Sequence, residues 1–189
     1  MFAKRLGVPV CTLILALSGV TPALAGVPLG GEPDVVTKTT SDDLPPITRE
    51  EIIIRARSWL DPPVPYSQAA NHTNDYGTYR TDCSGYLSMT WDLPEHGTNT
   101  VGLRELSEPI TGAELRQGDI LLDADGTNTS RHVVLFDRWA NAEKTRYVGY
   151  EQGTSGTVLR EIPYPYFSAM SDFHPYRRPN IADIPGTGA

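Results

Sequence analysis

The fold is decided by the stretch Tyr79-Arg80-Thr81-Asp82-Cys83-Ser84-Gly85-Tyr86, which leads into a mostly apolar run ending at Leu93. Asp82 is a residue type that caps helices, so we expect a helix from Asp82 to about Asp92 that carries Cys83 in its first turn. Free backbone N–H groups and the positive end of the helix dipole favour thiolate over thiol at that position. The stretch therefore predicts that Cys83 is a nucleophile presented by a largely buried helix.

The N-terminus has the pattern of a secretory signal peptide covering residues 1–25. Lys4 and Arg5 precede an apolar run from Leu6 to Val20, and Ala23-Leu24-Ala25 forms a small-x-small cleavage site. An anchoring helix is the alternative, but Pro9 interrupts a run that is already short for a membrane span. We therefore expect an exported protein that makes no membrane contact once the signal is cleaved.

Charge and cysteine content narrow the function further. Cleavage removes Lys4 and Arg5, which leaves 164 residues with 14 of the 16 basic side chains against 23 acidic ones, a formal charge of −9. This balance favours neither nucleic acid nor an anionic membrane as a partner. Cys11 leaves with the signal, so Cys83 becomes the only cysteine and forms no internal disulfide. An unpaired cysteine in an exported protein is either buried and inert or a reactive thiol, and the residues around Cys83 favour the second reading.

The remaining chain divides into a leader, one domain and a tail. Residues 26–47 are rich in Gly, Pro, Thr and Asp without periodicity, which predicts a flexible leader. Thr48-x-x-Glu51 is a capping box that begins a helix, and helices are then followed by a run of antiparallel strands up to residue 178. This order is typical of the α+β class. We expect residues 179–189 to form a frayed tail.

A cysteine nucleophile needs a base within hydrogen-bond reach, and the base needs a third group to orient it. His132 begins one expected strand and Glu151 ends the next. If the hairpin loop is centred between Asn141 and Ala142, His132 and Glu151 stand directly opposite each other and Gln152 points to the other face. A slip of one residue exchanges Glu151 for Gln152, so both remain candidates for the third position.

Several segments occur in an order that carries a resemblance. Val64-Pro65-Tyr66 is followed by Asp82-Cys83-Ser84-Gly85-Tyr86, then by Gly118-Asp119-Ile120 and by His132-Val133-Val134-Leu135-Phe136. In this order they resemble the NlpC/P60 family of cell-wall cysteine peptidases, over residues 48–178. The Tyr150-Glu151-Gln152 segment is similar to the related CHAP amidases, in which a glutamate completes the catalytic set.

The resemblance implies a papain-like α+β fold, with helices packed on an antiparallel β-sheet, and a thiol protease that needs no metal or organic cofactor. Cys83, His132 and Glu151 would be the catalytic residues. Backbone N–H groups at the start of the Cys83 helix would hold the oxyanion, together with the hydroxyl of Tyr66. The alternative for Tyr66 is a core aromatic residue whose hydroxyl is satisfied within the protein.

The resemblance also implies a substrate. It would be a peptidoglycan stem peptide, cut between D-glutamate and the following diamino acid by a secreted, cell-wall-associated monomer. Asp82 and Ser84 would contact the substrate's amine, although Asp82 also suits helix capping. Ser67-Gln68-Ala69-Ala70 departs from the tryptophan and paired glycines usual in the family. The alternatives are a CHAP-type amidase or endopeptidase on the same polymer, an acyltransferase, or a catalytically silent secreted binding or toxin-associated module.

Overall fold

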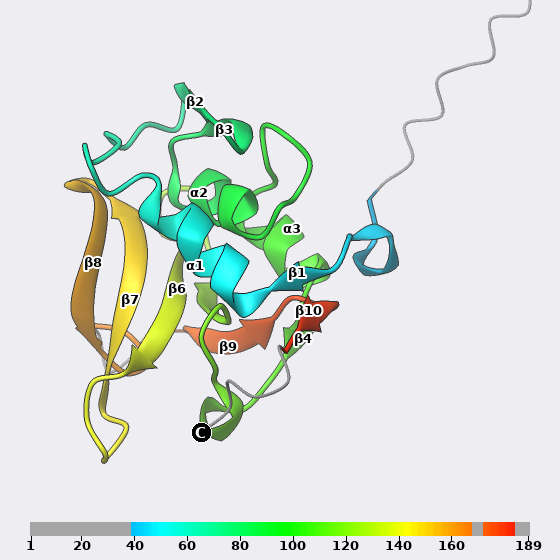
Figure 1. Ribbon diagram of the computed structural model, residues 1–189. Coiled ribbons are helices and arrows are strands. Elements are labelled where there is room, and N and C mark those ends of the chain that lie inside the picture. The colour runs from blue at the N-terminus through cyan, green and yellow to red at the C-terminus, as the bar shows by residue number, and fades with distance from the viewer. Residues whose placement is uncertain (1–38, 168–171, 184–189) are drawn as a thin grey trace, which may run out of the picture. The chain divides into compact units, whose positions relative to one another are not determined.

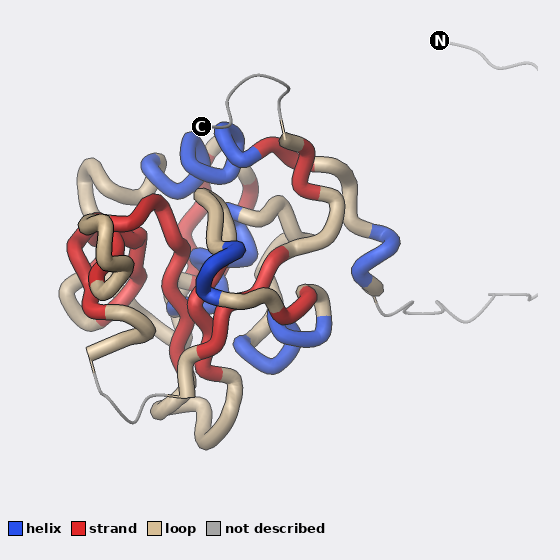
Figure 2. The backbone as a smooth tube through the Cα atoms, turned by 90° about the horizontal axis from the view of Figure 1, so that it is seen from below, coloured by secondary structure: helices blue, strands red, loops and turns tan. Residues whose placement is uncertain are grey.

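The largest element of the fold is a six-stranded antiparallel sheet with the strand order β4-β9-β5-β6-β7-β8 (Figure 1). The computed structural model describes residues 39–167 and 172–183, so the predicted signal peptide lies outside the described residues. The strands of this sheet are β4 Glu108–Pro109, β5 Ile120–Asp123, β6 His132–Trp139, β7 Arg146–Gly153, β8 Gly156–Pro163 and β9 His174–Arg177. Seen from below, these strands run side by side (Figure 2).

Most of the helical structure precedes the long strands in the chain. The α-helices are α1 Arg49–Arg57, α2 Cys83–Thr90 and α3 Thr100–Glu105, and the 3₁₀ helices are η1 Ser41–Asp43 and η2 Gly112–Glu114. A hairpin of β2 Asn71–Asn74 and β3 Gly77–Arg80 lies directly before α2. The mixed composition, with helices and an antiparallel sheet in separate parts of the chain, confirms the predicted α+β class.

The first two α-helices begin where the sequence predicts. Thr48 caps α1, because its hydroxyl accepts a hydrogen bond from the Glu51 N–H at 3.0 Å. All eight residues of α2 are buried, and α2 contacts β6 and β7. The Tyr86 hydroxyl of α2 donates to the Ala56 carbonyl of α1 at 2.7 Å, which links the two helices. The helix that carries Cys83 is therefore held on both sides.

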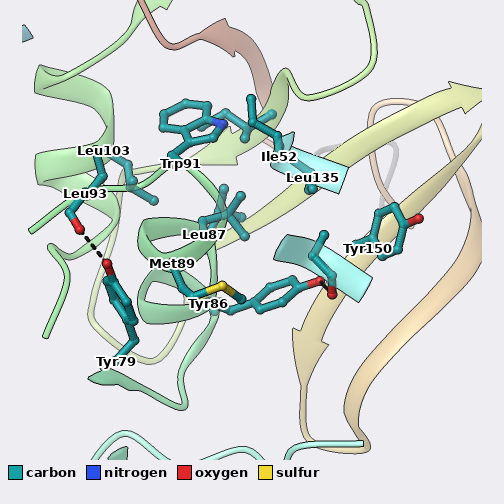
Figure 3. Packing of buried hydrophobic residues seen from close by; sticks show 14 of the residues in the cluster. Ile52, Tyr79, Tyr86, Leu87, Met89, Trp91, Leu93, Leu103, Leu135 and Tyr150 are labelled. Carbon is teal, nitrogen blue, oxygen red and sulfur yellow. Dashed lines mark hydrogen bonds between the residues drawn. The ribbon is translucent and has the colours of Figure 1, made fainter. Parts of the chain in front are cut away.

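The core between the helices and the sheet is built from large apolar side chains. Figure 3 shows Ile52 of α1, Leu87 of α2 and Leu135 of β6 within this core. The Tyr79 hydroxyl donates to the Leu93 carbonyl at 2.6 Å, which ties the segment after α2 to β3 (Figure 3). Each fully buried side chain of this size contributes about 1.5–3 kcal/mol through the hydrophobic effect. The packed core and this hydrogen bond thus fix the position of α2.

The opposite face of the sheet has an apolar cluster of its own. Its buried members are Leu115, Leu121, Val134, Phe136, Tyr147, Ile162 and Phe173. Alternate residues of β6 therefore point to two different cores, since Val133 and Leu135 belong to the helix side and Val134 and Phe136 to the other. His132 begins this strand, at the end of the sheet where both sides can be reached.

The inner ends of the expected leader and tail are ordered, which corrects their predicted boundaries. β1 Ile47–Thr48 pairs in parallel with β10 Ile181–Ala182, and Leu44 is buried. The Arg178 guanidinium donates to the Pro45 carbonyl at 2.7 Å. The sequence gives no signal for this order, because one two-residue strand pairing and one buried arginine leave no periodic pattern. The outer parts of both segments, residues 26–38 and 184–189, lie outside the described residues.

The pairing of β6 with β7 also differs from the prediction, by two residues. Leu135 pairs with Tyr150, and a β-bulge falls at Asp137. His132 and Glu151 are therefore diagonal neighbours, and the prediction that they stand directly opposite is wrong. Between the hairpin loop and the bulge, the strand pairing is shifted by three positions from the predicted register. The bulge reduces this shift by one position. The remaining shift of two keeps Glu151 on the same face as His132, since side chains alternate with a period of two.

Candidate active site

Cys83 is the first residue of α2, as the sequence predicts. The Asp82 carboxylate caps the helix by accepting a hydrogen bond from the Gly85 N–H at 2.6 Å. Among the described residues, the backbone N–H groups of Cys83 and Ser84 have no hydrogen-bond acceptor. Cys83 is 6% exposed, yet it lines a pocket of about 450 Å³. The thiol is thus shielded from bulk water but faces a space that a ligand can enter.

His132 lies between Cys83 and Glu151. Its Nε2 atom is 2.7 Å from Oε1 of Glu151. With Nε2 engaged in this way, Nδ1 is the ring nitrogen left for Cys83, whose side chain lies close enough to raise the pKa of His132. The three residues predicted from the sequence to act together therefore meet, although they come from α2, β6 and β7.

Glu151 is held by two further residues that the sequence reasoning missed. Nε and Nη2 of Arg160, on β8, lie 2.6 and 2.5 Å from Oε2. The Tyr166 hydroxyl donates to Oε1, which also contacts His132. Two nitrogens of one arginine on Oε2, and a second donor on Oε1, fix the carboxylate in one orientation. A signal for Arg160 existed, because a two-residue turn at Thr154-Ser155 places it on the same face as Glu151.

The charges of this chain of residues favour a protonated imidazole. Burial alone lowers the pKa of His132, but the hydrogen bonds and negative charges of Cys83 and Glu151 outweigh it and raise the pKa to about 9. Burial alone raises the pKa of Glu151, but hydrogen bonds from His132 and Tyr166 and the charges of His132 and Arg160 lower it to about 2. At neutral pH, His132 and Glu151 therefore form an ion pair.

Two aromatic rings cover the imidazole. The ring centroids of Tyr166 and Phe173 lie 5.6 and 6.2 Å from that of His132, and the two rings stack on each other at 4.4 Å. They restrict the rotation of the imidazole and exclude water from its contact with Glu151. Both residues follow β8 in the chain, far from the motifs that identified the site.

Gln152, the other candidate for the third position, points to the opposite face. Its Nε2 atom donates to the carbonyls of Thr81 at 2.9 Å and Val64 at 3.2 Å, and its amide oxygen accepts from the Thr157 hydroxyl at 2.6 Å. Thr81 lies two residues before Cys83, and Val64 lies two residues before Tyr66; both Cys83 and Tyr66 are predicted site residues. Gln152 thus holds the two segments that carry those residues and does not contact His132.

The cleft at this site consists of two hollows. The pocket on the Cys83 side adjoins a larger one of about 1050 Å³, which is lined by His132 and Glu151. Four residues line both hollows: Tyr66, Gln68, Asn128 and Arg131. Cys83 therefore borders one hollow and His132 the other, and an extended ligand that occupies both hollows lies beside both residues.

Asp82 and Ser84 lie in the Cys83 hollow but are already engaged. The Asp82 carboxylate accepts from Arg80 Nε at 3.0 Å and from the Ser84 hydroxyl at 3.1 Å, besides capping α2. Arg80 also donates to the carbonyls of Gly97 and Thr98, which fixes the loop forming the far wall. Asp82 therefore has the capping role weighed from the sequence, and both residues border the space where a ligand's amine would lie.

Tyr66 is half-buried and lines both hollows. Its hydroxyl accepts a hydrogen bond from Gln68 Nε2 at 3.2 Å, so its own proton is free to donate. Burial raises the pKa of Tyr66, the Gln68 hydrogen bond opposes this, and the charges of Cys83 and Asp82 add to the increase. The hydroxyl thus stays protonated and faces the cleft.

No family model and no curated protein matches the sequence. Within residues 39–167 and 172–183, no group of three or more His, Cys, Asp and Glu side chains is placed to hold a metal ion. In the same part of the chain, no helix is both long and apolar enough to cross a membrane.

Proposed function

We propose that this protein is a cysteine hydrolase that cleaves an amide bond through Cys83, His132 and Glu151. The observation that carries the proposal is the position of His132, which is bound to Glu151 through Nε2 and lies close enough to Cys83 for that residue to raise its pKa. Acyl transfer requires a nucleophile next to a base, and a carboxylate that orients the base. Cys83, His132 and Glu151 are arranged in this order.

The reaction follows from these contacts. The Cys83 thiolate attacks the carbonyl carbon, and the resulting oxyanion accepts hydrogen bonds from the N–H groups at the start of α2 and from the Tyr66 hydroxyl. The protonated His132 gives its proton to the leaving amine, and a thioester remains on Cys83. His132 then takes a proton from water, the hydroxide attacks the thioester, and the sulfur leaves as thiolate while the product departs as a carboxylic acid.

The fold proposed for this domain is the papain-like arrangement of the NlpC/P60 family. Three observations support it: a cysteine at the N-terminus of a buried helix, a histidine at the start of a strand facing it, and a polar third residue on the neighbouring strand. The ordered motifs from Val64 to Phe136 support the same assignment.

For the substrate, we propose a peptidoglycan stem peptide cut between D-glutamate and the diamino acid, by a protein exported to the cell wall. The signal-like N-terminus supports export, and the polar hollow with Asp82 and Ser84 beside Cys83 suits a substrate amine. A CHAP-type amidase or endopeptidase on the same polymer is the second candidate. Its support is Glu151, since a glutamate occupies the third position in that group.

The test uses the exported protein, after cleavage of the signal peptide, on purified peptidoglycan. We expect wild type to release soluble fragments and Cys83→Ala to release none. Mass spectrometry of the fragments separates cleavage inside the stem peptide from cleavage at the sugar–peptide amide. If Cys83→Ala were as active as wild type, the proposal that this protein is a cysteine hydrolase would be rejected. Iodoacetamide is expected to label Cys83 in the native protein, whereas a thiol that never reacts would support a silent binding module.

A further inference from the structure

Arg131 stands at the junction of the two hollows, one residue before His132. It is one of the four residues that line both of them. Its backbone N–H donates to the Thr127 carbonyl at 3.0 Å, which holds the Arg131 main chain against the preceding turn. The position is therefore close to the point where Cys83 and His132 would meet a substrate.

The guanidinium of Arg131 lacks the partner that such a group normally has. Within the described part of the chain, it makes no ion pair and its side chain donates no hydrogen bond. Its Nε atom is shielded from solvent without an acceptor. A buried donor that is left unpaired destabilises the protein, so an acceptor that arrives with a ligand relieves this cost and strengthens binding.

The other two arginines that line the cleft are already occupied. Arg80 bonds to Asp82 and to backbone carbonyls, and Arg160 binds Glu151 with two nitrogens. Among the described cleft residues, Arg131 is thus the arginine whose charge remains available. The chain as a whole carries more acidic than basic residues, so a local cation is needed if an anionic ligand is to bind here.

We propose that Arg131 binds a carboxylate of the substrate that lies next to the scissile amide. The inference rests on the proposed function and adds to it the chemical feature that selects the substrate. When a glutamate is linked through its γ-carboxyl group, its α-carboxylate stays free, and only the short glutamate side chain separates it from the cleaved bond. A guanidinium fork matches a carboxylate and can bind both of its oxygens. When the same position is amidated, the charge is lost.

The test compares two synthetic peptides, L-Ala-γ-D-Glu-L-Lys and the analogue in which the glutamate α-carboxylate is amidated, each also made with meso-diaminopimelate in place of lysine. Their dissociation constants are measured by calorimetry with the full-length Cys83→Ala variant, which binds without turnover. We expect the carboxylate form to bind at least about tenfold more tightly, as a charge-assisted pair provides. Adding Arg131→Gln should abolish the difference, and Arg131→Lys should retain part of it.

Arg146→Gln in the same background is the matched control, because Arg146 is exposed, pairs with Glu161 and lies outside both hollows. It should keep the full preference. The proposal is overturned if the two peptides bind equally, if neither binds, or if Arg131→Gln keeps the preference. Turnover of the same peptides by wild type is recorded separately. Binding with the expected preference but no cleavage would reject the proposed function and leave the carboxylate site standing.

Discussion

The two sides of His132 are built in opposite ways. On the Cys83 side, the ring meets a sulfur atom at the edge of a polar hollow with unpaired N–H groups nearby. On the Glu151 side, it meets a carboxylate that is 3% exposed and already bound by Arg160 and Tyr166. The first side is left open for a reacting group, and the second is saturated with donors. The orienting contact is therefore fixed before substrate arrives, while the reactive contact stays accessible.

The largest effect should come from removing the residue that joins the two sides. His132→Gln keeps a polar side chain of similar size but cannot accept and return a proton. We expect kcat/KM on peptidoglycan fragments to fall about a thousandfold, the range that general acid–base catalysis contributes. The measurement is steady-state kinetics, with Arg146→Gln as the surface control. Retention of more than a tenth of the activity would show that the two sides are not linked through His132.

A smaller effect is expected on the saturated side. Glu151→Gln keeps the shape but removes the charge that holds the imidazolium, so kcat/KM should fall about a hundredfold. The pKa of His132 should also decrease, since part of its increase comes from Glu151. A variant with full activity and an unchanged His132 titration would mean that Glu151 is a structural residue only.

Gln152 neighbours Glu151 in sequence, but its side chain points to the other face of the sheet. Gln152→Ala removes one of two donors from each of the carbonyls of Thr81 and Val64, and it leaves the buried Thr157 hydroxyl without its acceptor. The free energy of unfolding should fall by about 2–4 kcal/mol, measured by chemical denaturation. The loss of catalytic rate in the folded fraction should be smaller than that of Glu151→Gln. The reverse order of effects would reassign the third position to Gln152.

The helix start was predictable because its signal is local. A capping aspartate, the cysteine and an apolar run together determine where α2 begins, and no distant residue is needed. The same holds for the α+β class, since the order of helices and strands can be read from periodicity. His132 could be placed at the start of β6 for that reason.

What could not be predicted depends on contacts between distant parts of the chain. The bulge at Asp137 has no sequence pattern of its own, and without it Gln152 would share the face of His132. The hairpin of β2 and β3 is polar and only partly buried, so it lacks an alternating apolar signal. Tyr166 and Phe173 reach the imidazole from a segment after β8 whose composition indicates no role.

The central claim is that His132 is held as a cation between Cys83 and Glu151, and an NMR titration of its ring tests this most directly. His132→Gln assigns its signals among the four histidines of the chain. Because the pKa of His132 is about 9 in the folded protein and 6.5 ordinarily, protonation of His132 stabilises the fold. This stabilisation is fully present below pH 6.5 and is lost as the pH rises through about 9. We expect an imidazolium that persists at neutral pH and loses its proton near pH 9. A ring that titrates at or below 6.5 would contradict it.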